Sequence, residues 1–319
     1  MNWHGKNKDF PYKNLNQLFN EYEQECKYSS RLRSATVKGY TEVFRLFSLL
    51  MPEVTDVEAL TTEMLTEFFK RLQTRERIVG SNTIKVGVKN STIKTYWSKL
   101  NSFFEWLYRK GLIQDNPLKG IRPPELLYDD QRALGEDAVR KLYSAVTLHS
   151  KNTLVLRRDT AMISLLLFCG LRLGEFISLE ARDIDFEKRL LTVRGQTSKS
   201  KRTRYIPIHP TLLFHLKDYI AERNRRNYKT QYLIVPVAYD RGLTRNGLKY
   251  WVKSLSLKSG VKFHLHRFRH SFACNLAMKD VNAVKIQKLL GHSSLNMTMT
   301  YLRSIATEDM QDEINRLSI

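Results

Sequence analysis

Five residues near the C-terminal end have the types and the spacing that phosphate chemistry requires. His266, Arg269 and His270 are followed by His292 and then by Tyr301, all between positions 261 and 303. His266 and Arg269 lie three positions apart, so on a helix they share a face. An arginine offers phosphate oxygens a planar pair of donors, and a histidine can donate to a phosphate or move a proton near neutral pH.

The tyrosine adds a nucleophile to this set. Neighbouring positive charge favours the ionised phenol, and attack of a phenolate on a phosphodiester gives a phosphotyrosine. Such a transfer needs in-line positioning and positive charge where the equatorial oxygens become more negative. Taken singly, each residue has an ordinary explanation, because a tyrosine at a helix end usually packs in the core or lies at the surface. The combination indicates a site.

Four motifs in a fixed order carry a family resemblance. They are GLR at 170–172 with Glu175, HxxRH at 266–270, LLGH at 289–292, and Tyr301 nine residues after the last histidine. Their order and spacing resemble those of the tyrosine recombinase (phage integrase) family. The resemblance is close over about 132–305 and covers the N-terminal part only in kind.

The resemblance implies a role for each matching residue. Arg172 and Arg269 would clamp the non-bridging oxygens of the scissile phosphate, and His266 would assist at the same phosphate. His292 occupies the position that the family fills with His or Trp, where it would hydrogen-bond the phosphate. Tyr301 would be the nucleophile.

Two supporting residues and a general acid complete the implied site. Glu175 resembles the acidic residue that orients neighbouring catalytic groups, and His270 resembles the second histidine of the HxxRH motif. In the family, a lysine at a β-hairpin tip protonates the departing 5′ oxygen and often follows a glycine. Here Gln196 stands at that place and cannot act as an acid. Counting back eight residues from Pro207 gives Lys199, with Lys201 as the rival, so the tip would carry a three-residue insertion.

The implied function is site-specific DNA recombination. The enzyme would cleave and rejoin strands through a 3′-phosphotyrosine intermediate, without a metal or another cofactor, in resolution, inversion or integration of DNA. Its implied partners are double-stranded DNA with an inverted-repeat core site and a homotetramer, or a heteromer, on two such sites. Two alternatives stay open at this point: DNA relaxation of the type IB topoisomerase kind, and a catalytically inactive DNA-binding regulator.

Charge and composition favour a nucleic-acid partner. The 319 residues carry a formal net charge of +21, with a pI near 9.9, and 42% are hydrophobic. Excess positive charge opposes compaction but releases counterions from a nucleic-acid backbone. No apolar run approaches the ~20 residues that span a bilayer, and the first residues lack the apolar core of a signal peptide. We therefore expect a cytoplasmic, nucleoid-associated protein with no membrane partner, whose three scattered cysteines are reduced.

Apolar periodicity predicts a mainly α protein with two domains. Four amphipathic segments predict an N-terminal four-helix bundle at 14–114, after a flexible tail at 1–13. The resemblance implies that this bundle is a SAM-like core-binding domain. The prolines at 117, 123 and 124 predict a linker at 115–132. A C-terminal α-helical catalytic domain with a small antiparallel β-sheet and hairpin would fill 133–319. Its last helix, at about 305–319, resembles the family's tail that docks on a neighbouring subunit, and packing on its own domain is the alternative. So short a segment before the first helix suggests a Xer-like simple recombinase without an arm-binding domain.

The DNA-binding surface is expected on the first domain, the linker and the hairpin tip. Residues 70–122 include twelve basic residues and only three acidic ones. Polar residues of the fourth helix lie away from its apolar stripe, and this face suits a DNA groove, although a solvated face of charges is the plain alternative. The candidate DNA contacts are Lys85, Lys89, Lys94, Tyr96, Lys99, Lys119, Arg122, Lys201 and Arg202.

Overall fold

The computed structural model describes residues 14–80, 82–126, 133–198, 201–302 and 315. The chain divides into two compact units, residues 1–128 and 129–319, and each is treated by itself. The predicted tail at 1–13 lies outside the described residues, as does the predicted helix at about 305–319 apart from position 315. Among the described residues, no helix is long and apolar enough to cross a membrane.

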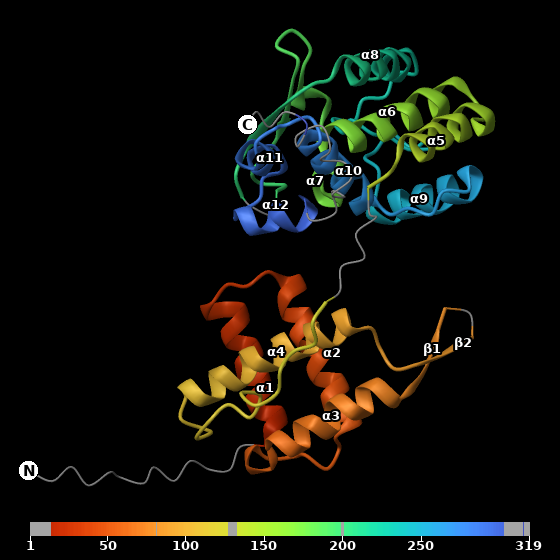
Figure 1. The fold of residues 1–319 in the computed structure, drawn as a ribbon. Coiled ribbons are helices and arrows are strands. Elements are labelled where there is room, and N and C mark those ends of the chain that lie inside the picture. Colours follow the sequence, from red (N-terminus) through yellow and green to blue (C-terminus); the bar gives the residue numbers. More distant parts are fainter. Residues whose placement is uncertain (1–13, 81, 127–132, 199–200, 303–314, 316–319) are drawn as a thin grey trace, which may run out of the picture. The chain divides into compact units, whose positions relative to one another are not determined.

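The N-terminal unit is a helical bundle with one β-hairpin (Figure 1). Its elements are α1 (Leu15–Gln24), a π-helical turn (Glu25–Ser29), α2 (Ser34–Leu50), a 3₁₀ turn (Val57–Ala59), α3 (Thr62–Thr74), β1 (Glu76–Val79), β2 (Thr83–Val86) and α4 (Asn90–Arg109). Side chains cap two of the helix starts: Asn14 accepts from the amide of Asn16, and Thr61 from that of Met64. Polar residues thus cap α1 and α3, whereas Arg33 and Lys89, which precede α2 and α4, make no such bond.

Aromatic residues fill the core of this bundle. Phe19 of α1 stacks on Phe44 of α2, with ring centroids 3.7 Å apart, and Phe103 of α4 meets both rings edge-on. The edge-on pairs suit the ring quadrupole and add to the stabilisation that burial provides. The apolar stripes of the sequence therefore meet in one core.

The β1–β2 hairpin replaces part of a segment for which the sequence predicted no regular element. The strands pair antiparallel, with Ile78 opposite Ile84, and the hairpin projects from the helices (Figure 1). Ile78 is 71% exposed and Ile84 is 64% exposed. β2 alternates between polar and apolar residues over only four positions, and β1 does not alternate, so the sequence pattern is too short to predict the hairpin.

Part of the predicted linker at 115–132 packs on the N-terminal unit. Leu118 is fully buried in the helical core, and the indole of Trp97 donates to the carbonyl of Ile121 at 2.8 Å. Thr62 donates its hydroxyl to the carbonyl of Pro117 at 3.0 Å. Residues 127–132 lie outside the described part of the chain.

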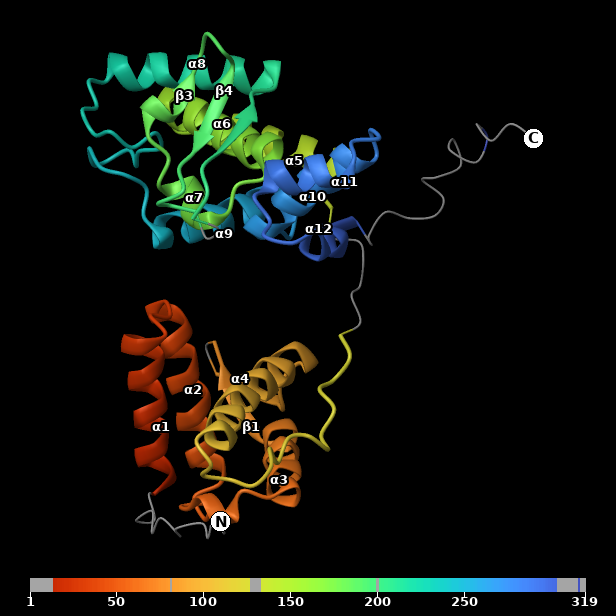
Figure 2. The same cartoon turned by 90° about the vertical axis from the view of Figure 1, so that its left-hand side faces the viewer.

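The C-terminal unit is built around one buried helix, α6. Figures 1 and 2 show α6 (Thr153–Cys169) in the middle of the unit, where it packs against α5, α8 and α10. The other elements are α5 (Glu136–His149), α7 (Leu173–Ile177), a 3₁₀ turn (Ala181–Asp183), β3 (Ile184–Asp185), β4 (Leu190–Val193), β5 (Arg204–Pro207), α8 (Pro210–Arg225), α9 (Arg245–Ser259), α10 (Leu265–Ala277), α11 (Ala283–Leu290) and α12 (Leu295–Leu302). Helices with small antiparallel sheets confirm the predicted fold class.

Two glycines end helices of this unit at positions that place later residues. Gly170 closes α6 with φ +54°, and a Cβ there would lie 2.5 Å from the ring of Phe272. Gly291 closes α11 with φ +66° and contacts the side chain of Arg204. Residues with a side chain rarely adopt such positive φ values, so glycine is needed at both turns. The first turn leads to Arg172 and the second to His292.

Candidate active site

Two arginines that the sequence places far apart meet at the C-terminal end of α11. Arg269 donates to the Leu290 carbonyl at 2.7 Å and to the Gly170 carbonyl at 2.6 Å. Arg172 donates to the same Leu290 carbonyl at 3.3 Å and to the Gly291 carbonyl at 3.1 Å. The carbonyls at a helix C-terminus carry partial negative charge and attract cations. The end of α11 therefore gathers both guanidinium groups beside the LLGH motif.

Glu175 fixes one of these arginines from the other side. Its carboxylate accepts from the Arg172 amide at 2.9 Å and from the Arg172 guanidinium at 3.0 Å. Both oxygens also accept from Arg204, at 3.0 and 2.8 Å, and Ser198 donates its hydroxyl at 3.1 Å. Burial by itself would raise the pKa of Glu175, but the bonds and charge of Arg204, and then those of Arg172, lower it to about 2. Glu175 is thus a buried, ionised anchor, in keeping with the orienting acid that the sequence predicted.

The cluster holds more positive than negative charge. Arg269 is 1% exposed and Arg204 8% exposed, and Arg172 keeps 17% of its side chain accessible. Burial, and then the charge of Arg172, lowers the pKa of Arg269 to about 10, so its guanidinium stays protonated at neutral pH. Three arginines share the one carboxylate of Glu175. An anion at this place would offset the excess charge, as a phosphodiester would.

His292 is neutral in this setting. Burial, and then the charges of Arg269 and Arg172, lowers the pKa of His292 to about 3. Its Nδ1 lies 2.8 Å from the hydroxyl of buried Thr298. Its Nε2 is buried and has no hydrogen-bond partner within the part of the chain that the structure describes, and the same holds for Nε of Arg269. A hydroxyl that donates to Nδ1 leaves the ring proton on Nε2, as donation to a phosphate oxygen requires.

Tyr301 of α12 lies between two histidine rings. The ring of His292 stacks on it at 5.3 Å between centroids, with an interplanar angle of 18°. The ring of His270 lies 5.3 Å away on a tilted plane, and the thiol of Cys274 bonds the tyrosine's carbonyl at 3.4 Å. Since Tyr301 stacks on His292, and Arg269 and Arg172 act on that histidine, the proposed nucleophile lies beside the arginine cluster.

His266 lies at the start of α10 and is exposed. Partial burial, then the nearby His264, Arg269 and Arg172, lowers its pKa. A neutral imidazole close to both arginines can accept a proton near neutral pH. The structure therefore brings together four of the six predicted catalytic positions, Arg172, Arg269, His292 and Tyr301, and places His266 three residues before Arg269 on the same helix.

The sixth position lies on the segment that joins β4 to β5. Lys199 and its neighbour at 200 fall outside the described residues. The rival Lys201 is exposed and has a left-handed backbone with φ +55°, and Arg202 is exposed as well. The strands pair with Val193 opposite Arg204, so Lys199 and Lys201 fall in the connection between β4 and β5. A hairpin tip is where the sequence predicted the general acid.

The predicted DNA contacts of the N-terminal unit divide into two groups. Exposed cations form the first, and they are Lys85, Lys89, Lys94, Lys119 and Arg122. The second group packs partly on its own unit: Lys99 places its ammonium 4.9 Å from the ring centre of Tyr40, and Tyr96 packs against Phe68. Burial raises the pKa of Tyr96.

Two residues of the cluster were not singled out from the sequence. Arg204 was one charge among many in a basic hairpin, and only the alternation of β5, with Arg204 and Ile206 buried, marks it as inward-facing. Thr298 lies three residues before Tyr301, one turn away on the same helix, and that spacing was the available signal.

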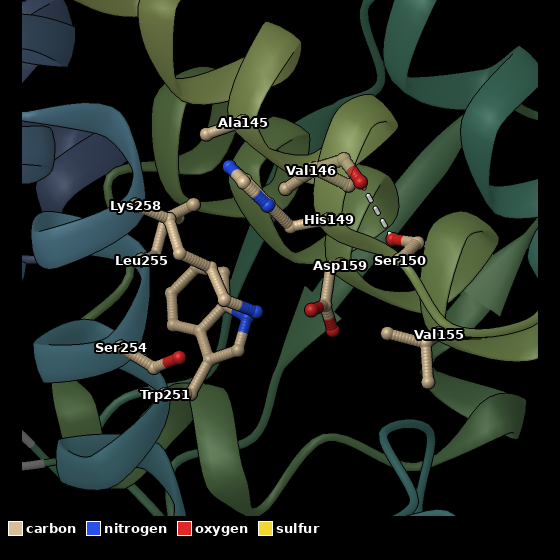
Figure 3. A pocket seen from close by; sticks show the side chains of 10 residues that line it. All are labelled: Ala145, Val146, His149, Ser150, Val155, Asp159, Trp251, Ser254, Leu255 and Lys258. Carbon is tan, nitrogen blue, oxygen red and sulfur yellow. Dashed lines mark hydrogen bonds between the residues drawn. The ribbon is translucent and has the colours of Figure 1, made fainter.

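The small pocket in Figure 3 belongs to another part of the C-terminal unit. It has about 30 Å³ and is lined by α5, α6 and α9, with His149, Asp159 and Trp251 among its residues. None of the six predicted catalytic residues lines it. Its volume suits about one water molecule. The arginine cluster is therefore the candidate site.

Comparison with known proteins agrees with this geometry. Residues 132–308 match the model of the phage integrase family, and this stretch covers more than half of the chain. The chain belongs to the phage integrase family. A tyrosine recombinase of Thermosipho africanus is 31% identical over 309 residues, which cover 94% of this chain and 98% of that relative. The tyrosine recombinase XerC of Alcanivorax borkumensis is 32% identical over 228 residues, 70% of this chain and 73% of XerC.

Solved structures of this family have the same fold. A lambda integrase fragment, solved as a dimer bound to a COC′ core site, has a TM-score of 0.70 at 19% identity, over 92% of this chain and 97% of that one. XerH bound to a palindromic difH substrate has a TM-score of 0.68 at 19% identity, over 93% of this chain and 84% of that one. Family membership confirms the predicted class of function: the chain is a tyrosine recombinase, a DNA strand transferase of site-specific recombination. The comparisons do not favour the two alternatives.

Proposed function

We propose that the chain cleaves and rejoins duplex DNA with Tyr301 as nucleophile and the arginine cluster as phosphate site. The observation that carries this proposal is the meeting of Arg172 and Arg269 on one carbonyl, that of Leu290, next to His292 and Tyr301. Each guanidinium keeps N–H donors that these carbonyls do not use, among them Nε of Arg269, and a phosphate oxygen can accept from them. The pre-arranged positive charge then meets the transition state without reorganisation.

In the first step, the phenol oxygen of Tyr301 attacks phosphorus in line with the 5′ oxygen. The P–O5′ bond breaks, a 3′-phosphotyrosine forms, and the 5′ end leaves as a hydroxyl. Arg172 and Arg269 bind the non-bridging oxygens, and His292 donates Nε2–H to one of them. His266, neutral because of its lowered pKa, takes the proton of the phenol.

The departing oxygen receives its proton from the hairpin tip. We assign this role to Lys199, with Lys201 as the alternative, because an ammonium can supply the proton and the neighbouring Gln196 cannot. The reverse reaction with the 5′-hydroxyl of a partner strand completes strand exchange, and Tyr301 recovers its proton. Glu175 and His270 support the site without touching the reacting atoms.

The N-terminal unit is proposed to hold the DNA. Residues 14–114 would form the core-binding domain and 133–319 the catalytic domain, and the described part of the linker at 115–132 packs on the N-terminal unit. The exposed cations Lys85, Lys89, Lys94, Lys119 and Arg122 support phosphate contacts. The proposed assembly is a homotetramer on two DNA copies that each carry an inverted-repeat core site, in the cytoplasm on the nucleoid. The solved structure of a lambda integrase tetramer bound to a Holliday junction, which shares this fold, supports this assembly.

A covalent trap tests the proposal. Duplexes that bind the full chain are selected from a randomised pool and rebuilt with a nick beside the cleaved bond, so that the 5′ fragment diffuses away. Wild-type protein should form an adduct that resists denaturation, and mass spectrometry should place the DNA on Tyr301. Tyr301→Phe should form none. No wild-type adduct, or an equal amount from Tyr301→Phe, would overturn the assignment.

A further inference from the structure

Arg204 lies at the centre of the cluster although it has no place in the mechanism above. It donates from Nη1 and Nη2 to the two oxygens of Glu175, at 3.0 and 2.8 Å, in a two-pronged pair. Its third donor, Nε, reaches the Leu289 carbonyl at 2.7 Å. The side chain is more than nine-tenths buried and lies against the backbone of Gly291. An arginine with three such bonds is locked in one orientation.

These contacts join the two supports of Arg172. One support is Glu175, and the other is the end of α11, whose carbonyls at 290 and 291 accept from Arg172. Arg204 bonds both the carboxylate and the same helix end, so it sets the distance between them. It is also the first residue of β5, directly after the hairpin tip. Arg204 could therefore act on the clamp, on the tip, or merely on the fold.

We infer that Arg204 is a positioning residue for phosphate binding, which orients Arg172 through Glu175 and the end of α11. Without Arg204, the carboxylate of Glu175 would be buried with less compensating charge, and Arg172 would turn toward it. A guanidinium that is drawn to Glu175 binds a phosphate oxygen less well. The chemical step should slow by about 100-fold, the upper end of the effect of residues that orient a catalytic group.

A chain residue at the same hairpin supplies a matched control. Arg194, directly after β4, forms ion pairs with the buried acids Glu180 and Asp183 and bonds neither Glu175 nor α11 in the described structure. Arg194→Gln therefore removes a comparable buried ion pair from the other strand of the hairpin. Arg204→Gln and Arg204→Lys are compared with it in the full chain.

Three substrates separate the possible roles, and this test rests on the proposed function. Single-turnover cleavage is measured on the normal phosphodiester, on a methylphosphonate, and on a substrate whose 5′ bridging oxygen is sulfur. The methyl group removes the negative charge that the clamp must bind, and a thiolate leaves without an acid. We expect Arg204→Gln to lose about 100-fold on the phosphodiester, to regain most of it on the methylphosphonate, and to stay slow on the sulfur substrate. Arg204→Lys, with one ammonium for a two-pronged contact, should fall between wild type and Arg204→Gln.

Each other outcome contradicts the inference. Recovery on the sulfur substrate would show that Arg204 acts through the hairpin lysine. An equal loss in Arg194→Gln at equal thermal stability would show a role in the fold alone, and wild-type cleavage by Arg204→Gln would show no role. If Arg204→Gln does not fold, Arg204→Lys decides by the same three rates. Absence of a wild-type adduct would instead contradict the proposed function and is seen before any variant is made.

Discussion

The two units carry positive charge in different ways. In the C-terminal unit, Arg269 and Arg204 are buried, and each directs donors to named acceptors. In the N-terminal unit, Lys85, Lys89 and Lys94 are exposed. A buried, oriented charge acts strongly on one atom, whereas an exposed charge in water acts weakly and over a wider area. The difference assigns chemistry to the first set and affinity for DNA to the second.

The largest loss of cleavage rate without a matching loss of DNA affinity should come from Arg269→Gln. The neutral side chain keeps its size but removes a guanidinium that donates at 2.6 and 2.7 Å within the cluster. Loss of one oriented donor to a developing anion costs about 100- to 1000-fold. Single-turnover cleavage of the nicked substrate should fall by that amount, while the Kd for DNA changes by less than about threefold. A fall in affinity as large as the fall in rate would contradict the division between the units.

The hairpin lysine should give the next largest effect. Lys199→Ala should slow cleavage by about 100-fold or more, as loss of a general acid does. Lys201→Ala should change the rate little and serves as the control, since both lysines lie on the same tip. A substrate with a 5′ bridging sulfur should restore Lys199→Ala. The reverse pattern would assign the acid to Lys201.

A smaller change is expected from Thr298→Val. The variant keeps the shape of a buried side chain but removes the hydroxyl 2.8 Å from Nδ1 of His292. The ring proton then no longer prefers Nε2, so cleavage should fall by about 10-fold. Thr298→Ser keeps the hydroxyl and should stay near wild type. Nitrogen NMR of the His292 ring reads the tautomer directly, and an unchanged tautomer in Thr298→Val would refute this role.

The motif residues and Glu175 could be predicted from the sequence, but the supporting residues Arg204 and Thr298 could not. His266 and Arg269 share a helix turn, and His292 precedes Tyr301 by nine residues, so local spacing was informative. The role of Arg204 depends on its hydrogen bonds to Glu175, 29 residues earlier, and to the end of α11. Only the packing of β5 against α11 brings these groups together.

The β1–β2 hairpin was missed for a different reason. Its apolar residues Ile78 and Ile84 are exposed. Their positions therefore do not mark a strand face that packs against the rest of the unit. The helices, by contrast, each bury an apolar stripe, and their existence followed from its period.

Stability at mildly acidic pH should depend on His292. Its pKa is lowered to about 3 in the folded protein, whereas an imidazole in the unfolded chain titrates near 6.5. Below pH 6.5 the His292 imidazole gains a proton in the unfolded chain but not in the folded one. The free energy of unfolding therefore decreases as pH falls, by at most about 1.4 kcal/mol per pH unit. Glu175, with its pKa lowered to about 2, affects stability only below about pH 4.5.

Urea unfolding at pH 7 and pH 5.5 measures this contribution. Wild type should lose more stability between the two values than His292→Gln does, because the other histidines are common to both proteins. Equal losses would show that His292 is protonated in the folded state, against the neutral donor of the mechanism.

The assignment of chemistry to the C-terminal unit and of DNA affinity to the N-terminal unit is tested most directly by cleavage at saturating protein. When all DNA is bound, the measured rate no longer depends on affinity. The double variant Lys85→Ala, Lys94→Ala should bind DNA more weakly than Lys38→Ala, an exposed control on α2, with a shallower salt dependence. At saturation its single-turnover rate should return to that of wild type, while Arg269→Gln stays about 100- to 1000-fold slower. A double variant that remains slow, or an Arg269→Gln that recovers, would contradict the account.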